Sequence, residues 1–68
     1  MQTGTIKWFN KEKGFGFIKP DDNSKDIFLY YKELKKINLE TIEAKTKISF
    51  DTKEDKNNRI YAHNLKLI

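Results

Sequence analysis

The chain has 68 residues, with 14 basic and 10 acidic side chains and a net charge of +4. This length suffices for one small domain with one core, so we expect a single domain over residues 1–68. The absence of cysteine excludes disulfides and thiolate metal sites, and no apolar run approaches the about 20 residues of a membrane span. The polar first residues show no signal peptide, which favours the cytoplasm. The mild positive charge permits a polyanionic partner but does not require one.

Five runs rich in β-branched and aromatic residues predict strands, because turn-forming residues separate them. They cover residues 5–10, 15–19, 26–31, 47–52 and 59–67. Between the third and fourth runs, Tyr31, Leu34 and Ile37 recur at a spacing of three, which predicts one short helical turn followed by an ordered connection. Three strands, a longer connection and two further strands suit a small closed or nearly closed β-barrel.

The second and third predicted strands carry apolar side chains on both faces. Successive side chains of a strand alternate between faces, so Phe15 and Phe17 lie opposite Ile18. In the same way, Phe28 and Tyr30 share one face of the third strand. A barrel of this size has one interior and no second layer, so one of the two sets must face outward.

Residue size indicates which set that is. Compact aliphatic side chains suit a small interior, and the expected core comprises Ile6, Ile18, Ile27, Leu29, Ile48 and Leu65. The outward set is then aromatic and comprises Trp8, Phe15, Phe17, Phe28 and Tyr30. An exposed aromatic patch is unfavourable without a partner. Rings beside Lys7, Lys11 and Lys13 suit single-stranded nucleic acid, because bases stack on rings for about 1–3 kcal/mol each and ammonium groups hold phosphates.

A competing interpretation makes Phe15 and Phe17 ordinary core residues beneath a lid formed by residues 32–45. Gly14 and Gly16 flank Phe15 in a strand that would normally avoid glycine. They therefore predict a close backbone approach or a tight bend.

No group of residues in the sequence carries a catalytic or metal-binding pattern. His63 is the sole histidine and lacks soft ligands beside it, so we expect a structural or surface role. Asp21 and Asp22 lie among turn formers and are expected at a solvated hairpin tip. We therefore expect no enzyme activity, cofactor, metal or small-molecule substrate. A protein-interaction module that uses the aromatic patch remains the second functional alternative.

Three segments together resemble the cold shock domain of bacterial cold shock proteins: KWFN at residues 7–10, KGFGFI at 13–18 and DIFLYY at 26–31. The resemblance is nearly continuous over residues 4–31 and extends to the strand at 47–50. It implies an all-β fold, a five-stranded antiparallel barrel of the oligonucleotide-binding (OB) type with a short helical turn after the third strand. It also implies binding of single-stranded RNA and DNA, and RNA chaperone activity that can regulate transcription or translation. We expect a monomer.

The resemblance implies roles for individual residues. The positions that match base-stacking rings of the family are Trp8, Phe15, Phe17, Phe28 and Tyr31. The remaining matches are Phe9 at the edge of that surface, Lys7 and Lys13 near the nucleic-acid backbone, and Asn10 and Asp26 at base edges.

Several positions depart from the family pattern, and four of them belong to the expected binding set. Tyr30 replaces the usual histidine, which keeps a ring but removes a side chain that can become positive near neutral pH. Tyr31 replaces the usual phenylalanine and also keeps a ring. Leu39 stands where many relatives place an aromatic residue, and Arg59 replaces the basic residue of the last turn. Glycines that relatives often carry are also missing, with Asn38 and Lys45 in two of their places. We expect left-handed backbone at some of the asparagines, which are Asn38, Asn57 and Asn58.

Overall fold

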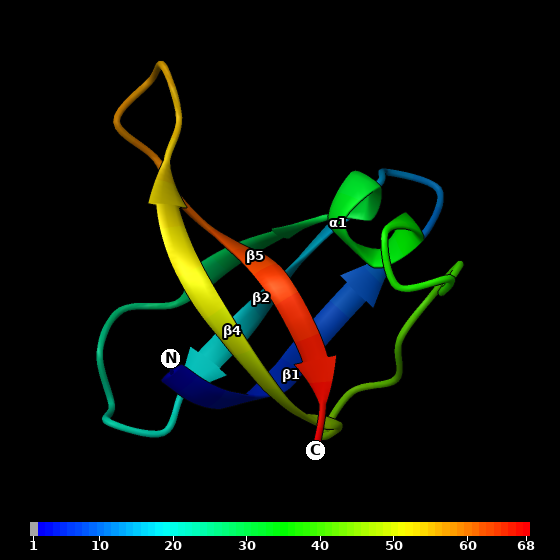
Figure 1. Ribbon diagram of the computed structural model, residues 1–68, viewed down its shortest axis with the longest axis horizontal. Helices are drawn as coiled ribbons and strands as arrows, with labels where there is room; N and C mark the ends of the chain where they lie inside the picture. The colour runs from blue at the N-terminus through cyan, green and yellow to red at the C-terminus, as the bar shows by residue number, and fades with distance from the viewer. Residues whose placement is uncertain (1) are drawn as a thin grey trace.

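The computed structural model describes residues 2–68, which form five strands closed into a barrel and one short helix (Figure 1). The elements are β1 Gln2–Asn10, β2 Phe15–Pro20, β3 Ile27–Tyr30, α1 Tyr31–Lys35, β4 Lys47–Glu54 and β5 Ile60–Leu67. Around the barrel the strands follow the order β1-β2-β3-β5-β4, and β4 pairs again with β1. The barrel and the short helix after the third strand are thus confirmed. No helix among these residues is long and apolar enough to cross a membrane.

One strand pairing corrects the expectation of an antiparallel barrel. β3 and β5 run parallel and meet at Phe28 and Tyr61, whereas the other four pairings are antiparallel. The reason is geometric, because a closed ring with an odd number of strands cannot alternate direction all the way around. The parallel pair is the contact that closes the barrel, and it brings β5 beside the aromatic face.

The interior contains all six aliphatic side chains that the sequence predicted, each at most 8% exposed. Four further side chains complete it, namely Leu34, Ile42, Phe50 and Ala62. Phe50 is fully buried on β4, so ring size alone does not decide which face a residue takes. Ile37 and Leu39 also pack against this core from the connection after α1. The connection therefore packs onto the core, while Phe15 and Phe17 lie outside it, which overturns the lid interpretation.

A β-bulge at Lys7 determines which face Trp8 occupies. Simple alternation would place Trp8 on the same side as the buried Ile6. The register instead shifts between these two residues, with Ile6 opposite Ile18 and Trp8 opposite Phe17. Lys7 is the extra residue, so Lys7 and Trp8 are both exposed.

Two glycines occupy positions where a side chain would not fit or would be strained. A Cβ at Gly16 would lie 2.7 Å from the Cα of Phe9, so β1 and β2 approach closely here as predicted. Gly14 has a φ of 79° in the turn between these strands. Among the expected left-handed asparagines, Asn38 and Asn58 have positive φ, whereas Asn57 does not. The remaining departures from negative φ are at Asn23, Lys45 and Asn64.

Candidate nucleic-acid interface

Aromatic rings from four strands form a continuous row across the outside of the barrel. We call this set the aromatic row; its members are Trp8, Phe15, Phe17, Phe28, Tyr30 and Tyr61. Ring centroids are 5.2 Å apart for Trp8 and Phe17, and 4.6 Å apart for Phe17 and Phe28. The row continues through Tyr30, whose ring is stacked at 21° on Phe28, to Tyr61 at 5.5 Å.

The rings of the row are partly exposed rather than fully exposed. Trp8 is 39% exposed, and the other five rings are half-buried because they pack against one another. None of them belongs to the hydrophobic core. The row is therefore a contiguous apolar surface of the kind that marks a binding site.

Charged and polar side chains border the row near β1. Lys7 Nζ lies 2.8 Å from Asp26 Oδ2, so these two predicted site residues form an ion pair with each other. Asn10 Oδ1 accepts the backbone N–H of Lys13 at 3.1 Å, which holds the turn between β1 and β2. An exposed ion pair contributes only about 0–1 kcal/mol, so a phosphate or base can exchange with it at little cost.

Cations also lie over rings at the other end of the row. The guanidinium carbon of Arg59 is 4.4 Å from the centroid of Phe28. Lys32 Nζ lies 5.8 Å from the ring of Tyr30 and 5.9 Å from that of Tyr61. Such cation–π contacts position positive charge on the same surface where bases and phosphates would meet.

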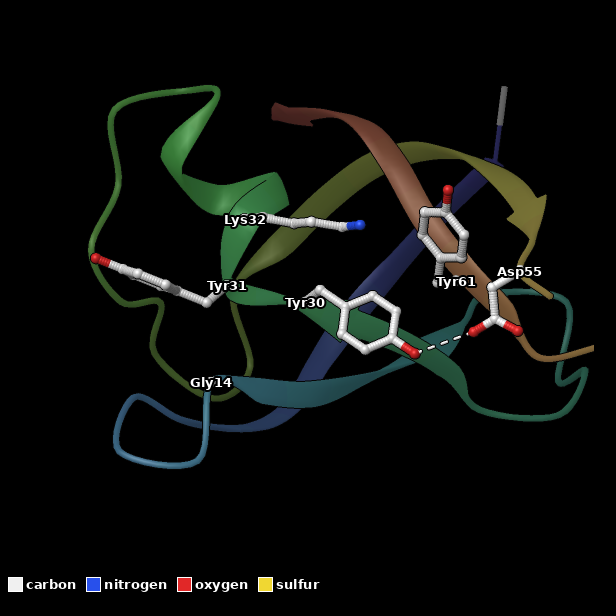
Figure 2. Close-up of a pocket in the computed structure, with 6 residues that line it drawn as sticks. All are labelled: Gly14, Tyr30, Tyr31, Lys32, Asp55 and Tyr61. Carbon is white, nitrogen blue, oxygen red and sulfur yellow. Dashed lines mark hydrogen bonds between the residues drawn. The ribbon is translucent and has the colours of Figure 1, made fainter. Parts of the chain in front are cut away.

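A hollow of about 420 Å³ opens beside Tyr30 and Tyr61. Its lining residues are Gly14, Tyr30, Tyr31, Lys32, Asp55 and Tyr61. Figure 2 shows the Lys32 side chain extending toward Tyr61, with Tyr30 and Asp55 nearby and the Tyr31 ring directed away from them. Lys32, Asp55 and Tyr61 were not among the predicted site residues.

Asp55 is held by hydrogen bonds from its own loop and from Tyr30. Its Oδ1 accepts the backbone N–H groups of Asn57 at 2.8 Å and Arg59 at 3.0 Å. Its Oδ2 accepts the hydroxyl of Tyr30 at 3.2 Å, the bond drawn in Figure 2. These bonds, led by the one from the Arg59 amide, hold the pKa of the Asp55 carboxyl below its ordinary value of 3.8.

Comparison with known proteins assigns the family. Residues 2–68 match the family model described as the 'Cold-shock' DNA-binding domain. The chain belongs to this cold-shock domain family. It is 44% identical over 66 residues to a probable cold shock protein of Sinorhizobium fredii, which covers 96% of both chains. It is also 49% identical over 51 residues to the probable cold shock protein A of Mycobacterium tuberculosis, covering 75% of this chain and 76% of the relative. Membership establishes a domain that binds single-stranded nucleic acid.

Two expected stacking positions of this cold-shock domain lie apart from the aromatic row. Tyr31 begins α1, and its N–H donates to the carbonyl of Gly14 at 2.9 Å. With Leu39 and Lys35 it lines a second hollow of about 260 Å³. Leu39 is half-buried and packs against the core, and the Lys35 ammonium lies 5.8 Å from the Tyr31 ring.

Two further residues singled out in the sequence, Phe9 and His63, are half-buried in the cold-shock domain. Phe9 is half-buried and packs against the hydrophobic core. His63 is half-buried on β5, in register with Asp51 of β4. Within residues 2–68, no group of three or more histidine, cysteine, aspartate or glutamate side chains could hold a metal ion.

Proposed function

We propose that this protein binds single-stranded RNA, and also single-stranded DNA, by stacking successive bases on the aromatic row. The observation that carries the proposal is the continuity of partly exposed rings across β1, β2 and β3, bordered by cations. Base–ring stacking is worth about 1–3 kcal/mol per base and accepts every base, since each has a π-face. Binding is therefore tolerant of sequence along most of the row.

The polar residues of the site have separate roles in this proposal. Lys7, Lys13 and Arg59 contact phosphates, and Asp26 exchanges its ion pair for a donor on a base edge. Asn10 keeps its Oδ1 in the turn and offers its NH₂ group to a base. Tyr31 and Leu39 contact the part of the nucleic acid that extends beyond the aromatic row, and of these two residues only Tyr31 supplies a ring.

Binding of this kind makes the protein an RNA chaperone. A protein that captures unpaired segments shifts RNA away from hairpins, because it binds the open state only. Binding energy drives this shift, so no nucleotide hydrolysis is required. We expect the protein to act as a monomer in the cytoplasm, with effects on transcription or translation.

The test uses Trp8 as the reporter, since it is the sole tryptophan and lies in the row. A short oligouridine and the matching oligodeoxythymidine are titrated into the protein at several salt concentrations. We expect fluorescence quenching by both, with log K falling by about 0.7 per phosphate contact for each unit of log salt. No quenching and no salt dependence would contradict the proposal and favour a protein-interaction surface.

A further inference from the structure

The hollow beside Tyr30 and Tyr61 differs from the rest of the aromatic row, because it combines rings with a carboxylate. The two tyrosine rings meet at 62° and form a corner rather than a stacked pair. Tyr30 is stacked on Phe28, so a strand that follows the row arrives at this corner. The volume of about 420 Å³ lies within the range of about 300–1,000 Å³ typical of small-ligand sites.

Asp55 gives the corner a fixed hydrogen-bond acceptor. A carboxylate offers about four lone-pair positions, and three of those on Asp55 are used by Asn57, Arg59 and Tyr30. The remaining position is on Oδ2, 3.2 Å from the hydroxyl oxygen of Tyr30, which can itself accept. A negative group repels phosphates, so this pair of neighbouring acceptors suits donors on the edge of a base.

Lys32 supplies the complementary donor. Its ammonium lies 5.8 Å from the Tyr30 ring and 5.9 Å from the Tyr61 ring, so it reaches over both walls of the corner. The corner thus offers a donor on one side and two acceptors on the other. Guanine carries a carbonyl oxygen beside two neighbouring N–H donors on its pairing edge, whereas uracil carries one N–H between two carbonyls.

We propose that the corner formed by Tyr30, Tyr61, Asp55 and Lys32 is a guanine-selective subsite at the end of the aromatic row. Asp55 Oδ2 and the Tyr30 hydroxyl accept from the two guanine donors, Lys32 donates to the guanine carbonyl, and the base rests against a tyrosine ring. This subsite rests on the proposed function, because it selects one base of a strand that the row already holds.

The alternative is that Asp55 serves only to hold the β4–β5 loop through its amide contacts. Asp55→Asn separates the two roles. The asparagine oxygen can still accept the Asn57 and Arg59 amides, so the loop keeps its main contacts, whereas its NH₂ group faces the guanine donors and repels them. Asp22→Asn is the matched control, because it makes the same charge change in the β2–β3 loop, where Asp22 lines a different hollow.

The experiment measures binding of short oligouridines in which a single guanine occupies each position in turn, read through Trp8 quenching. We expect one of these oligonucleotides to bind the unmodified protein roughly fivefold or more tightly than plain oligouridine, as for one well-placed base contact. Asp55→Asn should abolish this preference, while Asp22→Asn keeps it. Tyr61→Thr, which removes the ring but introduces a residue that favours strands, should weaken binding of the guanine oligonucleotide more than that of oligouridine.

The outcomes separate this proposal from the proposed function. Equal binding of all the oligonucleotides, or a guanine preference that survives in Asp55→Asn, overturns the guanine subsite and leaves the stacking function intact. If no oligonucleotide binds at all, both fail. A thermal unfolding curve of each variant shows that a lost preference does not come from unfolding, and Tyr61→Thr provides the second test if Asp55→Asn is unfolded.

Discussion

Gly16 lies in β2 where that strand closely approaches β1 at Trp8 and Phe9. A Cβ there would lie 2.7 Å from Phe9 Cα and closer still to the Trp8 carbonyl oxygen. We expect Gly16→Ala to cost about 3 kcal/mol or more of unfolding free energy, since both obstacles are backbone atoms that cannot yield without separating the strands. Because the overlap is with Trp8 itself, the variant should also bind oligonucleotides more weakly.

Gly14→Ala is the control for that substitution. Its Cβ would meet only the Tyr31 Cβ at 3.9 Å, so the cost comes from the φ of 79° alone and should be about 1–2 kcal/mol. Urea unfolding of both variants checks the difference. Equal losses at the two glycines would show that the close approach of β1 and β2 does not matter for stability.

Three aspartates predict how stability responds to acid. The pKa of each is lowered, chiefly by the Thr3 hydroxyl for Asp21, the Ser24 hydroxyl for Asp22 and the Arg59 amide for Asp55. The folded state therefore favours their ionised forms, and their stabilisation is complete above the ordinary pKa of 3.8 and is lost as pH falls through the lowered values. We expect the free energy of unfolding to decrease below about pH 4 for this reason.

Urea unfolding at several pH values checks this expectation against a variant with all three aspartates changed to asparagine. The variant should lose less stability between neutral pH and acid than the unmodified protein. If the free energy of unfolding fell equally with pH in both proteins, the three aspartates would have the same pKa in the folded and unfolded states, which contradicts this expectation.

At the scale of elements, the β4–β5 turn contributes a cation to the face formed by β2 and β3. Arg59 lies over Phe28, 4.4 Å from its centroid. If Arg59 holds a phosphate in the complex, Arg59→Gln should weaken binding and reduce the slope of log K against log salt by about 0.7. The exposed Lys56 in the same turn is the control, since Lys56→Gln makes the same charge change. If log K depended on log salt equally in the two variants, Arg59 would make no specific phosphate contact.

The strands and most of the core could be predicted from the sequence, because alternation within a strand is a local property. Where the alternation of side chains is interrupted, the sequence predicts the wrong face for the residues that follow. The bulge at Lys7 leaves no clear sequence signal, yet it is what allows Ile6 to be buried and Trp8 to be exposed. Phe50 was missed for a related reason, since sorting residues by size ignores the space that a particular strand leaves inside the barrel.

The part of the site that the sequence could not predict depends on how the whole barrel closes. Tyr61 reaches the aromatic row through the parallel contact between β3 and β5, which joins residues distant in the chain. Asp55 reaches Tyr30 across the same closure. No periodicity in the sequence predicts these contacts, so the predicted site included Tyr30 and Arg59 but neither Tyr61 nor Asp55.

The division of the molecule into an aromatic outside and a mainly aliphatic inside is its central feature. It predicts opposite behaviour for two phenylalanines, Phe28 in the aromatic row and Phe50 in the core. Phe→Leu at each position removes a ring but keeps an apolar side chain. A single experiment, Trp8 quenching by oligouridine alongside urea unfolding, measures both effects.

We expect Phe28→Leu to lose about 1 kcal/mol or more of binding free energy, roughly fivefold in affinity, with little change in stability. We expect Phe50→Leu to lose roughly 1–2 kcal/mol of stability while its folded fraction binds as tightly as the unmodified protein. The reverse result would contradict this account: a Phe28→Leu protein that unfolds readily but binds normally when folded would make Phe28 a core residue and leave the aromatic row without its function.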